Sequence, residues 1–195
     1  MKTVVATKDF ADFPVFDRIM SEAFPPEELF LPSDIVKLPN VRIEAYYDDD
    51  DTPLGMSISR FYEGVHFLEM FAFDPKHRGR GFGSETIKHL LKQHPDDVFI
   101  GYVERPDPSY EDNNQRLSRL NFYKRAGFTF HDLQIRVCGV DFIAIAHGPG
   151  ADDRQKVIDG CIAAAKDLPN ILRACHIPFE EYNDVTVEGQ YIPMK

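Results

Sequence analysis

A glycine- and arginine-rich stretch is the part of the sequence whose residue types and spacing indicate a specific chemistry. It reads Arg78-Gly-Arg-Gly-Phe-Gly-Ser84 and follows an apolar run that ends at Phe73. Glycine at every second position permits positive φ angles and a close approach of the backbone to a ligand. If a helix begins here, its first N–H groups and its dipole attract anions, as do the two arginines. Residues 78–84, which we name the glycine turn, therefore predict a diphosphate site.

Two better-known phosphate-binding loops do not fit this segment. A Walker loop needs Gly-Lys followed by Ser or Thr, and the chain contains no Gly-Lys pair. A dinucleotide fingerprint that began at Gly79 would need a glycine where Ser84 stands. The remaining alternative is a basic turn that leads into a helix and binds nothing.

Hydrophobic periodicity predicts the elements that position the glycine turn. Strands are expected over residues 2–7, 41–48, 54–62, 65–73, 98–103, 128–135 and 137–146. Helices are expected after the first strand and over residues 83–94, 111–126 and 152–168, and four prolines leave only short helical pieces in 25–39. This order predicts an α+β fold around one mixed sheet, with the last helix in a C-terminal extension.

Composition excludes several classes of protein. The 195 residues fit one domain with room for an extension. The formal net charge of −10 disfavours nucleic acid and anionic lipid as partners. No apolar run approaches the roughly 20 residues of a membrane span, and the N-terminal residues show no long apolar run, so we expect a cytoplasmic protein. Three widely spaced cysteines and seven histidines form neither CxxC nor HExxH, so no metal site is expected.

Two motifs resemble one protein family. The glycine turn resembles the [RQ]xxGx[GA] acetyl-CoA signature of the GCN5-related N-acetyltransferases, the GNAT superfamily. Asn121-Phe-Tyr-Lys-Arg-Ala-Gly-Phe128 resembles the FYxxxGF ending of that family's next helix and strand. The order and spacing of the two motifs also match the family. The sequence departs from the pattern at Arg116, where the family often has an asparagine.

The resemblance covers residues 1–147 and implies a GNAT-like fold, which is a central, mixed and mostly antiparallel sheet flanked by helices. Residues 148–195 lie outside it and form a C-terminal helical extension. Its amphipathic helix and apolar tail predict that it packs on this domain or on a partner subunit, for which a homodimer is one possibility. Acetyl-CoA is the implied acyl donor. The residues implied to bind it are Phe71 and Phe73, through their main chain, and Arg78, Gly79, Arg80, Gly81, Phe82, Gly83 and Ser84.

The resemblance also implies catalytic residues. Moving an acetyl group from a thioester to an amine requires a base for the amine and a proton for the departing thiolate. Tyr123 coincides with the family's tyrosine that donates to the sulfur, and packing in the core is the alternative role for it. Glu69 and Glu104 both stand where the family's strands diverge around the thioester, so either could be the base. Glu69 could also point to solvent.

We therefore expect an acetyl-CoA-dependent N-acetyltransferase that acts on a primary amine of a small molecule or peptide. The acidic surface weakly favours a cationic amine. The alternative is a non-catalytic acyl-CoA-binding or interaction protein with the same fold. Thiol release from acetyl-CoA, compared with CoA binding alone, discriminates between the two.

Overall fold

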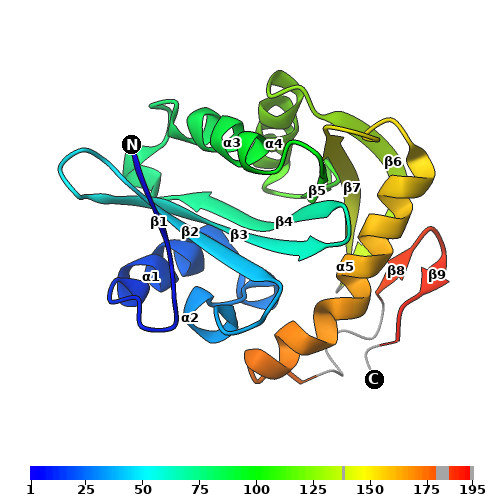
Figure 1. Cartoon of the computed structure of the whole chain (residues 1–195). Helices are drawn as coiled ribbons and strands as arrows, with labels where there is room; N and C mark the ends of the chain where they lie inside the picture. The colour runs from blue at the N-terminus through cyan, green and yellow to red at the C-terminus, as the bar shows by residue number, and fades with distance from the viewer. Residues whose placement is uncertain (138, 179–184, 194–195) are drawn as a thin grey trace.

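The computed structural model describes residues 1–137, 139–178 and 185–193. Its strands form one sheet in the order β1-β2-β3-β4-β5-β7-β6-β8-β9 (Figure 1). All neighbouring strands in this sheet are antiparallel except β4 and β5, which are parallel. The expected α+β fold with a mixed, mostly antiparallel sheet is therefore confirmed.

The element bounds follow the predicted pattern closely in the first three quarters of the chain. The strands are β1 (Lys2–Val5), β2 (Val41–Tyr47), β3 (Pro53–Tyr62), β4 (Val65–Phe73), β5 (Val98–Glu104), β6 (Thr129–Val137), β7 (Val140–His147), β8 (Thr186–Val187) and β9 (Gln190–Tyr191). The helices are α1 (Phe13–Ala23), α2 (Pro32–Ile35), α3 (Phe82–Gln93), α4 (Asn113–Arg125) and α5 (Arg154–Ala174), with 3₁₀ turns at Pro26–Glu28 and Pro75–His77.

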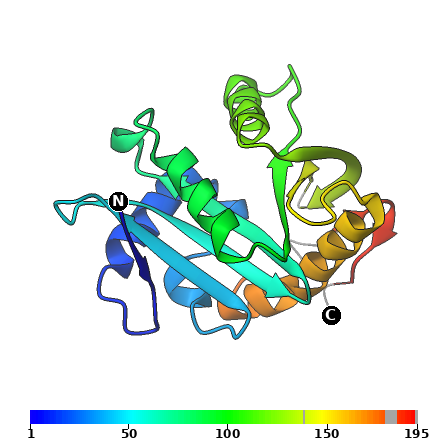
Figure 2. The same ribbon diagram turned by 45° about the horizontal axis from the view of Figure 1, so that its top comes forward.

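Helices cover both faces of the sheet. Helices α3 and α4 lie on one face, and α1, α2 and α5 lie on the other (Figures 1 and 2). Each face has its own hydrophobic core. The core under α3 and α4 contains Ile87, Leu90 and Tyr123, whereas the larger core under α1 and α5 contains Phe16 and Ile171. The sheet thus separates two compartments, and anything that connects them must pass between strands.

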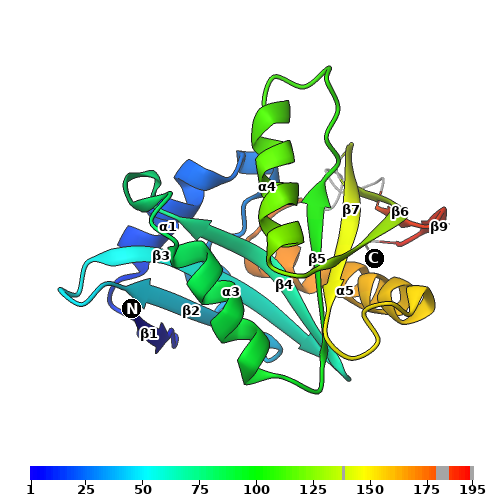
Figure 3. The same ribbon diagram turned by 90° about the horizontal axis from the view of Figure 1, so that it is seen from above.

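The parallel pair β4 and β5 provides such a passage. The two strands pair only from Val65–Leu68 to Val98–Gly101, and beyond these residues they separate, as Figure 3 shows. Strand β4 also carries a bulge, because Ile58 lies opposite Met70 while Ser59 lies opposite Leu68. Glu69 is the extra residue of this bulge and has no partner residue on β3. A bulge re-aims a side chain, so the carboxylate of Glu69 is placed at the point where the strands part.

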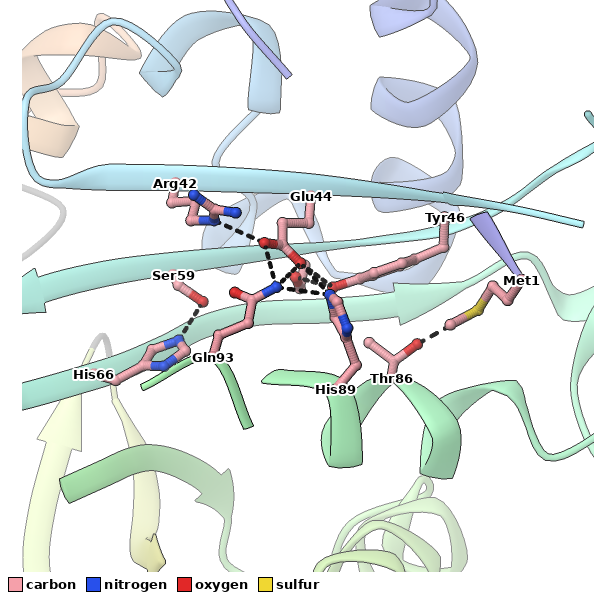
Figure 4. Close-up of polar contacts among 10 residues, drawn as sticks. Met1, Arg42, Glu44, Tyr46, Ser59, His66, Thr86, His89 and Gln93 are labelled. Carbon is pink, nitrogen blue, oxygen red and sulfur yellow. Dashed lines mark hydrogen bonds and ion pairs between the residues drawn. The ribbon is translucent and has the colours of Figure 1, made fainter. Parts of the chain in front are cut away.

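A buried polar cluster fixes helix α3 to the sheet (Figure 4). The carboxylate of Glu44 on β2 accepts a hydrogen bond from Arg42 Nε at 2.7 Å and one from Gln93 Nε2 at 3.0 Å. His89, one turn earlier on α3, lies 3.3 Å from the same carboxylate. Because only 1% of Glu44 is exposed, these partners compensate a charge that would otherwise be costly to bury. The C-terminal half of α3 is therefore fixed to β2.

The C-terminal part of the chain differs from the predicted bounds. We expected the last helix to end at Leu168, but α5 continues through Pro169 to Ala174. The apolar face of α5 continues beyond the proline with Ile171 and Leu172, both fully buried, and this burial offsets the local cost of a proline inside a helix. The short strands β8 and β9 were also not predicted, because two-residue strands carry no periodic signal. No helix in the described part of the chain is long and apolar enough to span a membrane.

Candidate active site

The glycine turn has the backbone geometry that an anion site requires. Gly79 and Gly81 have φ angles of +76° and +89°, and a Cβ atom added to either would meet no atom within 4 Å. Gly81 is the N-cap of α3, and no side chain caps this helix end. The first N–H groups of α3 therefore have no intrahelical acceptor and follow a glycine backbone. The residues present fit a diphosphate group such as that of CoA.

The two arginines of the glycine turn are placed differently. Arg78 lines the cavity described below, and its Nε lies 3.4 Å from the carbonyl oxygen of Phe73. Arg80 does not line this cavity. Its guanidinium lies 3.3 Å from the ring of His77 and 5.2 Å from the ring centroid of Phe82. The structure therefore brings Arg78, but not Arg80, together with the other predicted site residues.

One cavity of about 900 Å³ connects the glycine turn with the strand split. Its lining includes residues of both compartments, so the cavity passes through the sheet where β4 and β5 separate. The predicted site residues that line it are Glu69, Phe71, Phe73, Arg78, Gly79, Gly81, Phe82, Gly83, Ser84, Glu104 and Tyr123. Residues that are far apart in the sequence thus share one space large enough for part of a cofactor and a small acceptor.

Glu69 does not point freely into solvent. Its carboxylate forms an ion pair with Arg60 on the neighbouring strand β3, and 13% of its side chain is exposed. Arg60 is itself buried and donates to the carbonyl oxygen of Ala164 on α5 at 2.8 Å. Glu69 therefore reaches from the bulge toward the compartment of α5, at the edge of the cavity.

Glu104, the second candidate base, is held by two arginines of α4. Arg119 forms an ion pair with one carboxylate oxygen, and Arg116 Nη2 lies 3.4 Å from the other. Arg116 also binds Asp112 at 2.9 Å and the carbonyl oxygen of Arg105 at 3.3 Å. It does not line the cavity, so the residue at which the sequence departs from the family pattern joins the end of β5 to the start of α4.

Tyr123 lies in the third turn of α4 and contacts both the core and the cavity. Its ring packs edge-on against Phe122 and Phe128, with centroids 5.0 and 5.2 Å away. Burial raises the pKa of the Tyr123 phenol to about 12, against the opposing effect of the nearby Arg119 charge. The phenol therefore stays protonated at neutral and mildly alkaline pH. A group that donates a proton to a leaving thiolate must be protonated there.

Phe71 and Phe73 lie on the free part of β4. Their rings face the α3 and α4 side, where Phe71 stacks on Phe122 and Phe73 stacks on Phe82, each pair with centroids 6.3 Å apart. One edge of the strand pairs with β3, while the edge that faces β5 has no strand partner beyond Leu68. The main-chain groups on this second edge are therefore free of strand pairing beside the cavity.

The sequence reasoning missed the residues that complete the cavity on the side of α5. These include Arg60, Tyr102, Ala164, Ala165 and Leu168. Arg60 carried a usable signal, because it shares a strand face with the apolar Ile58, and an arginine on a core-facing strand position requires a buried partner. Ala164 and Asp167 lie far away in the sequence, and the pairing with Glu69 depends on the strand register, so the identity of these partners had no local signal. Within the described residues no group of three His, Cys, Asp or Glu side chains is placed to hold a metal ion.

Part of the chain matches a family model, and the whole fold resembles solved structures. Residues 42–130 match the model of the acetyltransferase (GNAT) domain. No curated protein sequence matches the chain. Among solved structures, a protein described as a GNAT-family acetyltransferase from Bacteroides thetaiotaomicron aligns with a TM-score of 0.66 and 23% identity, over 80% of this chain and 93% of that one.

Two further structures have a similar fold. A spermidine N-acetyltransferase variant from Vibrio cholerae aligns with a TM-score of 0.61 and 11% identity, over 80% of this chain and 99% of that one. A Bacillus subtilis acetyltransferase in complex with CoA aligns with a TM-score of 0.54 and 8% identity, over 76% of this chain and 98% of that one. At these identities the structures show the fold alone. Residues 42–130 thus match an acetyltransferase (GNAT) domain in sequence, and the chain shares its fold with these acetyltransferases of known structure.

Proposed function

We propose that the protein is an N-acetyltransferase that moves the acetyl group of acetyl-CoA to a primary amine of a small molecule or peptide. The observation that carries this proposal is a cavity that joins the uncapped N-terminus of α3, on one side of the sheet, to Glu69, Glu104 and Tyr123 at the strand split. The GNAT domain match supports acyl transfer. The similarity to a structure determined with CoA and to a spermidine N-acetyltransferase is consistent with this donor and acceptor class.

Each end of the cavity has a separate task in this proposal. The N–H groups of the glycine turn hold the diphosphate, and the free edge of β4 at Phe71 and Phe73 orients the pantetheine chain. When bound, acetyl-CoA supplies an activated acyl group. Glu69 accepts a proton from the amine, directly or through water, as the new N–C bond forms. Tyr123 gives its phenol proton to the sulfur as the C–S bond breaks.

One observation favours the non-catalytic alternative. Both candidate bases already have arginine partners, since Glu69 pairs with Arg60 and Glu104 pairs with Arg119. A substrate amine would have to displace a guanidinium to reach either carboxylate. A protein that binds acyl-CoA without transferring the acyl group would tolerate both pairs.

The discriminating experiment measures binding and turnover separately on the full-length protein. CoA binding is measured by calorimetry, and thiol release from acetyl-CoA is measured against a broad panel of primary amines, with products identified by mass spectrometry. We expect CoA binding together with amine-dependent thiol release and an acetylated product. Binding without thiol release above the amine-free rate would support the alternative, whereas no CoA binding would contradict both functions.

A further inference from the structure

The cavity extends well beyond the reacting groups into the compartment of α5. Its lining there consists mainly of apolar and aromatic side chains, namely Phe30, Phe67, Tyr102, Ala164, Ala165 and Leu168. All of them belong to the large core under α1 and α5 or pack against it. Three come from α5, which lies outside the residues that match the family domain. The far wall of the cavity is therefore built by the C-terminal extension.

We propose that this half of the cavity is the acceptor site, and that the acceptor is a small primary amine with one cationic group and an apolar body, aromatic or branched aliphatic. The inference rests on the proposed function and adds the class of acceptor to it. The amine would lie beside Glu69 at the strand split, and its apolar body would pack against Ala165 and Leu168 of α5.

The distribution of charge argues against a polyamine in this site. Among the described residues that line the cavity, the carboxylates belong to Glu28, Glu69 and Glu104. Glu69 and Glu104 form ion pairs with arginines, and the negative charge of Glu28 acts on Arg119. A second ammonium group would have to compete with these arginines or lie against the apolar wall, where an unpaired charge is costly. An apolar body removes water from the same wall and gains free energy.

Hydrogen bonds to the sheet hold the α5 wall of the cavity in place, so that the wall can select acceptors by their shape. Arg60 on β3 donates to the carbonyl oxygen of Ala164 and lies 3.6 Å from Asp167. Tyr62 also donates to Asp167, at 3.1 Å, and Tyr102 on β5 donates to the carbonyl oxygen of Cys161 at 3.0 Å. Because α5 is tied to two strands of the sheet at the level of the cavity, its small side chains leave a pocket of fixed size.

The first test compares acceptors that differ only in their apolar body. Ethylamine, butylamine and phenylethylamine are measured against spermidine, by thiol release and by direct binding to the CoA-saturated protein. We expect kcat/KM to rise about fourfold per buried methylene, which corresponds to about 0.8 kcal/mol, and phenylethylamine to exceed spermidine at least tenfold. Equal use of ethylamine and phenylethylamine, or a preference for spermidine, would overturn the inference.

The second test changes the wall itself. Ala165→Phe fills the pocket and should raise the KM for phenylethylamine at least tenfold, with an unchanged Kd for CoA. Ala163→Phe, two residues earlier on α5 and outside the cavity, is the matched control and should leave both values unchanged. Leu168→Ala enlarges the pocket and should improve a bulkier naphthyl amine relative to phenylethylamine.

The readouts separate failure of the inference from failure of the proposed function. In one outcome no amine supports thiol release, but phenylethylamine binds the CoA-saturated protein and Ala165→Phe abolishes this binding. This outcome supports the acceptor pocket and contradicts the proposed catalysis. If spermidine and phenylethylamine turn over equally well and Ala165→Phe changes neither, the enzyme stands and the apolar acceptor site does not. Thermal midpoints of all variants show whether they are folded, and the enlarging Leu168→Ala variant keeps the test valid if Ala165→Phe does not fold.

Discussion

The carboxylate of Glu69 is ion-paired with the guanidinium of Arg60, and through this buried arginine the candidate base is joined to the C-terminal helix α5. The pair depends on the bulge in β4, which places Glu69 on the strand without a partner residue on β3. Glu69 is therefore both the candidate base and one partner of a buried ion pair. Two substitutions separate these roles.

Glu69→Gln tests whether Glu69 is the catalytic base. If Glu69 takes the proton of the amine, the variant should lose about 10- to 1000-fold in kcat/KM near neutral pH. The loss should shrink as pH rises, because the amine is then deprotonated by solvent and a base matters less. A pH profile of kcat/KM checks this, with Glu104→Gln measured alongside. A loss that eases with pH in Glu104→Gln alone would transfer the role to Glu104.

Arg60→Met tests how much the buried ion pair with Glu69 contributes to stability. Only 3% of Arg60 is exposed, and the substitution leaves Glu69 and Asp167 without their shared cation. Removing one partner of a buried pair typically costs about 3–5 kcal/mol of stability. Urea unfolding should show this loss, and the double variant Arg60→Met/Glu69→Gln should lose less than the sum of the two single changes. Strict additivity would mean that the pair contributes no coupling energy.

Much of the site could be predicted because its signals are local in sequence. The glycine turn and the Tyr123 motif each lie within one short segment, and the anion-binding role proposed for the turn follows from glycine conformations and a helix end. The ion pairs of Glu69 and Glu104 could not be predicted, since their partners depend on strand register and on the helix that follows. The alternation of apolar and polar residues in β4 does not reveal the bulge at Glu69. Helix α5 contacts β3 because the C-terminal helix folds back under the sheet, which no local pattern indicates.

Tyr123→Phe separates a proton donor from a core residue. The change keeps the packing of the ring against Phe122 and Phe128, so the thermal midpoint and the Kd for CoA should hold. Turnover should fall by about 10- to 1000-fold, because the leaving thiolate loses its proton source. Tyr47→Phe, which removes a phenol outside the cavity, is the control for losing a hydroxyl. Wild-type kcat in Tyr123→Phe would leave solvent as the proton donor.

Gly81→Val tests the backbone anion site. Gly81 has a φ of +89°, which a β-branched residue avoids, and the substitution should distort the start of α3. We expect the Kd for CoA to rise at least tenfold, whereas Arg80→Ala, outside the cavity, should change it less than about threefold. Gly64→Val is the matched control, because Gly64 also has a positive φ, +68°, but does not line the cavity. An unchanged Kd in Gly81→Val would refute the assignment of the glycine turn.

The burial of His66 predicts that the folded protein loses stability at acidic pH. Its ring is buried on the α3 side of the sheet, lies 4.3 Å from the ring of Phe99 by centroids, and contacts Ser59 through Nε2 at 2.8 Å (Figure 4). Burial lowers the pKa of His66 from 6.5 to about 3, helped by the neighbouring His94 and Arg42. The unfolded chain therefore binds a proton at this position at a higher pH than the folded protein does.

The sign of the effect follows from this difference. Above pH 6.5 the His66 ring is neutral in both states and its contribution to stability is complete. Between pH 6.5 and about 3 the unfolded state is protonated first, so stability should fall with decreasing pH by about 1.4 kcal/mol per pH unit. Urea unfolding of the wild type and of His66→Gln at pH 7.5, 5.5 and 4.5 measures this term as the difference between the two proteins. The exposed His176→Asn variant controls for the loss of a histidine. A difference between wild type and His66→Gln that stays constant with pH would mean that His66 is readily protonated in the folded protein.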